Sequence, residues 1–277
     1  MAHEHHHHGH TGHDHGHAHG DSGLPELLDL DAEVSAAQFA ELTTRVADLA
    51  GDHPVRHIVD LGSGTGSGTF ALLRQFPTAT ATAVDTSDDM LRHLTGSAHR
   101  HGLAQRITPL RADLDEKWPD VDPADLVWAS SSMHHMADPD RVLREIRAAL
   151  RPGGLLVMIE MEHMPRFLPP GAEGGLEDRC HALAEQIRNE HLPHIGSDWN
   201  TRLAAAGLTV REQRTLDVEL TAPLPAAAVR YARAALQRFR SDRLSPADQA
   251  ALDRVLASLD HRDDLTVRST RDVWIAG

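Results

Sequence analysis

The sequence predicts an α/β fold, a doubly wound, mostly parallel seven-stranded sheet with helices on both faces and helical lid insertions. Two observations carry this prediction. Strands and helices alternate from residue 56 to about residue 162, and the strands are continuously apolar, as in a parallel sheet covered on both faces. The second half is less regular, with two more strands among several helices. We expect a histidine-rich tail at 1–22 and one domain at 23–277, with core segments at 54–162, 198–222 and 263–277 and lid segments at 24–50, 163–197 and 223–262.

The first half of the domain opens with a helical segment at residues 24–50, in which apolar residues recur at helical spacing until Gly51 and Pro54 close it. Each strand that follows is short and apolar, and each helix is amphipathic. We predict a turn at residues 151–154, where Pro152 is followed by two glycines. The predicted strands lie at 57–61, 79–84, 106–111, 125–129 and 155–161, and the predicted helices at 69–75, 87–101 and 140–150.

The second half contains more helix than strand. Ser245 followed by Pro246 is typical of a helix N-cap with proline at the first helical position. Gly207 is expected to end the helix at residues 198–206. Predicted helices lie at 176–190, 198–206, 225–240 and 246–259, and predicted strands at 208–220 and 265–275.

Composition excludes several classes of function. Aromatic residues make up 4% of the 277 residues, and the net charge of −14 is not offset by a basic stripe, so we expect no nucleic-acid binding. The single cysteine, Cys180, excludes an intrachain disulfide and a multi-cysteine metal site. No apolar run reaches the length of a membrane span, and the N-terminus lacks the apolar core of a signal peptide. We therefore expect a cytoplasmic protein without membrane contact, either a monomer or a homodimer.

The tail at residues 1–22 differs from the rest of the chain. Ten of its first twenty residues are histidine, and a segment that buries no apolar surface is expected to be disordered. The irregular spacing of its histidines favours a native segment over an expression tag. Neutral imidazoles bind Zn²⁺ or Ni²⁺, so the tail either buffers such a metal or has only adventitious affinity for it. We expect no metal site within the fold; the tail candidates are His5, His6, His7 and His8.

A glycine-rich segment, VDLGSGTGSG at residues 59–68, lies where a predicted strand ends and a helix begins. Glycines at such a turn allow close backbone approach of a ligand, and the next helix offers free N–H groups. No Lys-Ser or Lys-Thr pair follows, which excludes a Walker-type phosphate loop. The dinucleotide pattern fails from Gly62 and from Gly64. A cofactor site is favoured over a simple turn because four glycines alternate within seven residues.

Asp85 ends the second predicted strand, nineteen residues after Gly66. An acidic side chain at this place can accept both ribose hydroxyl hydrogens of an adenosine. The alternative is an aspartate that caps the next helix. Thr86 and Ser87 could do that capping, so the ribose role is favoured.

Five segments in this order and spacing resemble the class I S-adenosylmethionine-dependent methyltransferases. They are DLGSGTG at 60–66, Asp85, RADL at 111–114, WASSSMHHM at 128–136 and LRPGGLLV at 150–157. The resemblance covers about residues 30–160. It implies S-adenosylmethionine as cofactor and a binding site made of Asp60, Gly62, Gly64, Gly66, Asp85, Thr86, Asp113, Leu114 and Ser130.

The same resemblance implies methyl transfer by in-line displacement to oxygen, nitrogen or carbon of a small-molecule acceptor. His134 and His135 follow the fourth strand and are candidates for a general base, since histidine titrates near neutral pH. The alternative is that they only pack near the loop. Glu160 and Glu162 end the fifth strand, where a solvated strand end is favoured over contact with a substrate or metal.

Two other functions stay open from the sequence. A noncatalytic S-adenosylmethionine-binding protein, perhaps responsive to metal through its tail, would bind the cofactor without turnover. An NAD-dependent oxidoreductase would need the dinucleotide fingerprint that the glycine segment lacks, and it has no use for Asp113.

Overall fold

The computed structural model describes residues 23–277. The tail at 1–22, with the metal candidates His5, His6, His7 and His8, lies outside the described residues. The described chain forms a seven-stranded sheet in the order β3-β2-β1-β4-β5-β7-β6. The first five strands pair in parallel, and β7 runs antiparallel to both of its neighbours. The predicted fold class is confirmed.

The strands agree with the predicted ones to within a few residues because most are short apolar runs between turn residues. The strand at 210–220 is an exception, since it is eleven residues long and alternates exposed with less exposed positions. In β4 every residue except the last is buried, as expected for a central parallel strand covered on both faces. The strands are β1 (His57–Leu61), β2 (Thr80–Asp85), β3 (Ile107–Arg111), β4 (Ala124–Ser130), β5 (Leu150–Glu160), β6 (Val210–Leu220) and β7 (Val267–Ala276).

Helices cover both faces of this sheet. On one face α2 (Ala36–Ala50), α3 (Ser67–Gln75) and α4 (Asp88–Arg100) share an apolar core with the strands. On the other face α5 (Pro139–Ala149) and α7 (Trp199–Ala205) form a second core. Because β1 to β5 are parallel, their carboxyl ends open at one edge, where α/β folds bind ligands.

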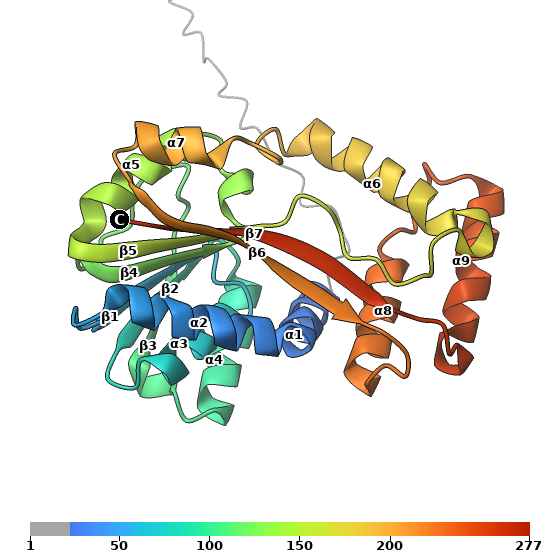
Figure 1. Ribbon diagram of the computed structural model, residues 1–277, viewed down its shortest axis with the longest axis horizontal. Helices are drawn as coiled ribbons and strands as arrows, with labels where there is room; N and C mark the ends of the chain where they lie inside the picture. The colour runs from blue at the N-terminus through green and yellow to red at the C-terminus, as the bar shows by residue number, and fades with distance from the viewer. Residues whose placement is uncertain (1–22) are drawn as a thin grey trace, which may run out of the picture.

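The remaining helices form a cap with an apolar core of its own. It contains α1 (Leu24–Val34), α6 (Leu176–His191), α8 (Ala226–Gln237) and α9 (Pro246–Ser258). Figure 1 shows α6, α8 and α9 gathered around the far ends of the long strands β6 and β7. Val218 of β6 and Val267 of β7 belong to this core, so the two strands join the cap to the sheet.

The single helix expected over residues 24–50 is two helices, and this prediction is corrected. The break lies at Ser35, which is buried and accepts a hydrogen bond from Arg271 Nη1 at 3.2 Å. Leu27 and Leu30 of α1 pack into the cap, whereas Leu42 and Val46 of α2 pack against the sheet. The apolar spacing continues across Ser35, so the sequence pattern could not show that the two halves face different cores.

The turn predicted at residues 151–154 lies inside β5, which begins at Leu150. The pairing with β4 shifts register there, from Leu150 opposite Ala124 to Leu155 opposite Leu126. A Cβ on Gly154 would lie 3.1 Å from the carbonyl oxygen of Asp125, so only glycine fits this irregularity without a shift. The glycines therefore interrupt the register and do not end the strand.

Within residues 23–277 no helix is both long and apolar enough to cross a membrane. The same residues contain no group of three or more His, Cys, Asp or Glu side chains placed to share a metal ion.

Candidate functional site

A cavity of about 2790 Å³ lies between the carboxyl ends of the parallel strands and the cap. Sites for a single small molecule usually measure about 300–1,000 Å³, so this one has room for a cofactor and a second molecule. Every cofactor-binding candidate except Gly66 lines it, as do both candidate bases, His134 and His135. Residues from β1, β2 and β4 form its floor, and residues from α1, α6 and α8 form its opposite wall.

The glycine loop between β1 and α3 has a backbone that other residues cannot adopt without strain. Gly62 and Gly64 have φ angles of 69° and 52°, in the left-handed region. A Cβ on Gly62 would lie 2.6 Å from the Cβ of Ser132, which follows β4. The N–H groups of Gly62 and Ser63 both donate to the carbonyl of Val84 at 2.9 Å, which ties the loop to β2.

Gly66 lies behind this loop and does not line the cavity, and its predicted contact with the cofactor stays a prediction. Its φ is 90°, and an added Cβ would lie 2.8 Å from Leu94 Cγ and 3.0 Å from Phe70 Cζ. The glycine is needed because α3 and α4 pack closely against the loop. The sequence showed the requirement for glycine but not its cause.

Asp60 orders the loop from below. Its side chain is 2% exposed, and Oδ2 accepts a hydrogen bond from the Thr69 hydroxyl of α3 at 2.5 Å. Burial, with a smaller contribution from the charge of Asp85, raises the pKa of Asp60 to about 7, against the opposing effect of the Thr69 bond. Asp60 therefore links β1 to α3 and sits at the floor of the cavity.

Asp85 holds the glycine loop and the residue before α4 through its two carboxylate oxygens. Oδ2 accepts from the N–H of Gly64 at 2.8 Å, and Oδ1 accepts from the N–H of Ser87 at 2.9 Å. The cap of α4 itself is Ser87, whose hydroxyl accepts from the N–H of Met90. Each carboxylate oxygen can accept two hydrogen bonds, so Asp85 keeps acceptor capacity for a ligand in the cavity.

The remaining cofactor candidates form the rim of the same cavity. Leu114 is 4% exposed, whereas Asp113 and Thr86 are exposed. Asp113 Oδ1 accepts from the N–H of Asp115 at 2.8 Å, which holds its turn. Ser130 is half-buried at the end of β4. These side chains flank the cavity at the carboxyl ends of β3, β2 and β4.

Three buried polar atoms near the glycine loop lack a hydrogen-bond partner within the described residues, namely Ser63 Oγ, Ser132 Oγ and Trp128 Nε1. Ser132 lies against Gly62, and a Cβ on Gly68 would lie 2.6 Å from Trp128 Nε1. All three residues line the cavity. Buried polar groups are nearly always bonded, so this cluster indicates a polar ligand beside the loop.

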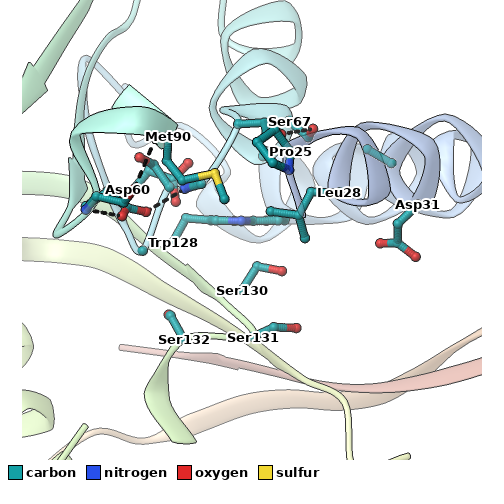
Figure 2. Close-up of a pocket in the computed structure, with 18 of the residues that line it drawn as sticks. Pro25, Leu28, Asp31, Asp60, Ser67, Met90, Trp128, Ser130, Ser131 and Ser132 are labelled. Atoms are coloured by element: carbon teal, nitrogen blue, oxygen red, sulfur yellow. Dashed lines mark hydrogen bonds between the residues drawn. The ribbon is translucent and has the colours of Figure 1, made fainter. Parts of the chain in front are cut away.

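Helix α1 forms a roof over the glycine loop that the sequence did not predict in this detail. Leu28 Cδ1 lies 3.4 Å from where a Cβ of Gly64 would be. Figure 2 shows Leu28 and Asp31 of α1 across the cavity from Ser130, Ser131 and Ser132. Ser131 has a φ of 52°, uncommon for a residue with a side chain, and such strained residues concentrate at functional sites.

His134 and Glu160 form a buried pair, each 6% exposed. Glu160 Oε1 accepts from the N–H of Met133 at 3.0 Å, and Oε2 pairs with Nδ1 of His134. Nδ1 donates in this arrangement, so the neutral ring keeps its lone pair on Nε2. The solvated strand end favoured for Glu160 is therefore wrong, because the carboxylate turns inward to hold a histidine; Glu162 is exposed, as expected.

His135 lines the same cavity but is exposed, with its ring centroid 4.3 Å from that of His134. Loss of solvation, followed by the charges of His134 and Arg188, lowers the pKa of His135 to about 4. A general base works best with a pKa near the working pH. The two neighbouring histidines thus have different environments, and only His134 has an orienting carboxylate.

Comparison with known proteins agrees with this architecture. Residues 59–156 match the family model described as a methyltransferase domain. The chain is similar to a trans-aconitate 2-methyltransferase of Azoarcus sp. strain BH72, with 32% identity over 198 residues, 70% of this chain and 63% of the relative. It is also similar to the 27-O-demethylrifamycin SV methyltransferase of Amycolatopsis mediterranei, with 32% identity over 152 residues, 51% of this chain and 53% of the relative. The match thus spans less than two thirds of either relative.

Solved structures share the fold. An O-methyltransferase family protein from Burkholderia thailandensis has a TM-score of 0.52 at 20% identity, covering 71% of this chain and 57% of that chain. The YcgJ protein of Bacillus subtilis has a TM-score of 0.52 at 14% identity, covering 87% of this chain and 97% of that chain.

These findings converge with the motif resemblance. The strand order, with β7 inserted antiparallel between β5 and β6, accompanies a glycine loop after β1 and an acidic residue at the end of β2. The matched domain covers both motifs. Nothing comparable supports the oxidoreductase alternative, whose dinucleotide fingerprint is missing from the loop. The chain contains a methyltransferase domain of the class I S-adenosylmethionine-dependent type.

Proposed function

We propose that this protein transfers a methyl group from S-adenosylmethionine to a small-molecule acceptor, with His134 as the general base and Glu160 as its positioning residue. The observation that carries the proposal is the buried His134–Glu160 pair, whose histidine lines the same cavity as Asp85 and the glycine loop. The names of the relatives, which act on trans-aconitate and on a rifamycin, support a small-molecule acceptor.

The residues around the loop fit the cofactor. Gly62 and Gly64 let the backbone approach its amino-acid part, and Ser63, Trp128 and Ser132 offer unpartnered polar atoms there. Asp85 would hold the ribose. Asp113 and Leu114 would flank the adenine. When bound, the sulfonium supplies an activated methyl group, and its transfer forms the acceptor–carbon bond while the S–CH₃ electron pair returns to sulfur.

The chain contributes alignment, exclusion of water and removal of a proton. The α1 roof and the cap shield the cavity, and correct alignment can lower the barrier by about 7–11 kcal/mol. An acceptor O–H or N–H releases its proton as the bond to carbon forms. Nε2 of His134 takes that proton, and the Glu160 carboxylate stabilises the imidazolium through Nδ1. Carbon acceptors with an acidic C–H would use the same base.

The test separates binding from chemistry with two variants. Asp85→Ala removes ribose hydrogen bonds and should weaken S-adenosylhomocysteine binding by about 1.5–3 kcal/mol in calorimetry. His134→Gln should leave that affinity unchanged and lower kcat by about 10²- to 10⁴-fold, because the base is lost. Turnover is followed as S-adenosylhomocysteine formed from a panel of phenols, hydroxy acids and amines.

His163→Gln is the matched control, since His163 also pairs with a glutamate, Glu185, but on the surface and outside the cavity. It should behave as the unmodified protein does. Equal rates for His134→Gln and His163→Gln would contradict the base assignment. Cofactor binding without turnover of any panel member would favour the noncatalytic alternative. Removal of residues 1–22, with activity measured with and without Zn²⁺ or Ni²⁺, tests whether the tail takes part.

A further inference from the structure

The cap side of the cavity has an apolar wall and one cation from α6. Met161, Met164 and Leu192 line it, together with the half-buried side chain of Arg188. Arg188 lines the same cavity as His134 and His135, and its charge acts on His135 and Glu160. This wall therefore meets the proposed base on the acceptor side.

The hydrogen bonds of Arg188 leave most of its donors unused. Nη1 donates to the carbonyl of Glu162 at 3.1 Å, and Nη2 donates to the carbonyl of Met161 at 3.3 Å. A guanidinium carries five N–H donors in a planar fork. Among the described residues Arg188 has no carboxylate in ion-pair contact. The two carbonyl bonds hold the side chain at the end of β5, with donors to spare.

The two acids whose charges act on Arg188 are already engaged. Glu160 accepts from Met133 and pairs with His134, and Glu185 pairs with His163 at 2.9 Å. Burial is the largest influence on Arg188, and it lowers the pKa of the guanidinium despite these two acids. A half-buried cation without a contacting anion is costly, and a ligand anion would offset that cost.

Arg271, which also lines the cavity, shows the contrasting case. Its Nη2 donates to both carboxylate oxygens of Asp31, at 2.5 and 2.7 Å, and its Nη1 donates to Ser35. Arg271 is therefore neutralised within the fold and serves its structure. Arg188 has the same chemistry, but its fork is not closed by a carboxylate.

We propose that Arg188 binds a carboxylate group of the acceptor, separate from the atom that is methylated, while that atom lies beside His134. This inference rests on the proposed function and names its substrate class: a small hydroxy or amino acid with an apolar body. The body would contact Met161, Met164 and Leu192. An arginine fork matches a carboxylate in bidentate geometry, which would orient the acceptor toward the base.

The test uses the full chain saturated with S-adenosylhomocysteine and a matched pair of probes, benzoate and benzamide. The two have the same shape and differ in charge. Benzoate should bind in calorimetry and shift the Arg188 Nε–H resonance, and benzamide should bind at least about tenfold more weakly. Equal binding of the two probes, or no binding of benzoate at millimolar concentration, would overturn the proposal.

Two variants and one control locate the site. Arg188→Gln keeps a donor for the carbonyls but loses the charge, and it should weaken benzoate binding by about 10- to 100-fold without affecting benzamide. Arg188→Lys should recover part of the affinity. Arg243→Gln is the control. Arg243 pairs with Glu190, which lies in α6 like Arg188, but this pair is outside the cavity. The variant should leave the affinities for benzoate and benzamide unchanged.

An unchanged benzoate affinity in Arg188→Gln refutes the assignment. S-adenosylhomocysteine binding is measured first for every variant. Failure of that step would count against the proposed function, whereas failure of the benzoate step alone counts against the carboxylate site.

Discussion

The cofactor side of the cavity and the helical cap meet at one site but are built differently. On the cofactor side, each functional group is placed by the strand that directly precedes it, as with Gly62 after β1 and Asp85 at the end of β2. In the cap, contacts join distant parts of the chain. Arg271 of β7 bonds to Asp31 of α1, 240 positions away, and Tyr231 of α8 donates to the same carboxylate at 2.5 Å. The cofactor side is thus built from short-range order along the chain, whereas the cap depends on contacts between distant residues.

The largest expected effect comes from breaking the cap at its junction with the sheet. Arg271→Leu leaves the partly buried Asp31 without its cation, and losing one partner of a buried pair costs about 3–5 kcal/mol. The loss of stability should lie near the lower end of this range, because Tyr231 still donates a hydrogen bond to Asp31. The free energy of unfolding in denaturant measures it.

Arg240→Leu is the control for that experiment. Its partner Asp253 and Arg240 itself are both more than half exposed, so the loss should not exceed about 1 kcal/mol. If both variants lost the same stability, the junction would have no special role in holding the cap.

On the cofactor side, Gly62→Ala should reduce S-adenosylhomocysteine affinity. Gly102 has almost the same φ, 68° against 69°, but open space around its Cβ position. Both alanines pay the same backbone strain, whereas only Gly62→Ala also meets Ser132, a crowding worth about 1–3 kcal/mol. Calorimetry on both variants should therefore show weaker binding only for Gly62→Ala. Similar affinities in the two would mean that close packing of the loop is unimportant.

The smallest effect is a pH dependence of the cap. His181 is 2% exposed in α6, and burial, with the charge of Arg166, lowers its pKa from 6.5 to about 4. Below pH 6.5 this histidine binds a proton in the unfolded chain but stays neutral in the folded chain. Stability is thus lost as pH falls from about 6.5 toward 4.

Comparison with His181→Leu isolates this contribution, because His135, which also has a lowered pKa, is present in both proteins. Between pH 7 and 5 the unmodified chain should lose about 2 kcal/mol more than the variant. Parallel pH profiles of unfolding would show that His181 does not titrate as inferred.

Residues whose position follows from their own strand or turn could be predicted from the sequence. Asp60, Asp85 and the glycine loop lie where the pattern placed them, because a strand followed by a turn and a helix fixes its own edge of the sheet. The need for glycine at position 66 was also visible, although its cause, the approach of Leu94, was not. The burial of the Glu160 side chain could not be predicted, because exposed and buried strand ends have the same local sequence pattern.

The sequence by itself determined the sheet, its helices and the cofactor edge, since period, turn residues and strand ends are short-range properties of the chain. Only the tertiary structure decided which histidine has an orienting carboxylate, why the first helix breaks at Ser35 and that Arg188 faces the cavity without an anion. These features depend on which distant elements pack together, and that choice is made by burial of whole faces and pairing of charges, not by any local pattern.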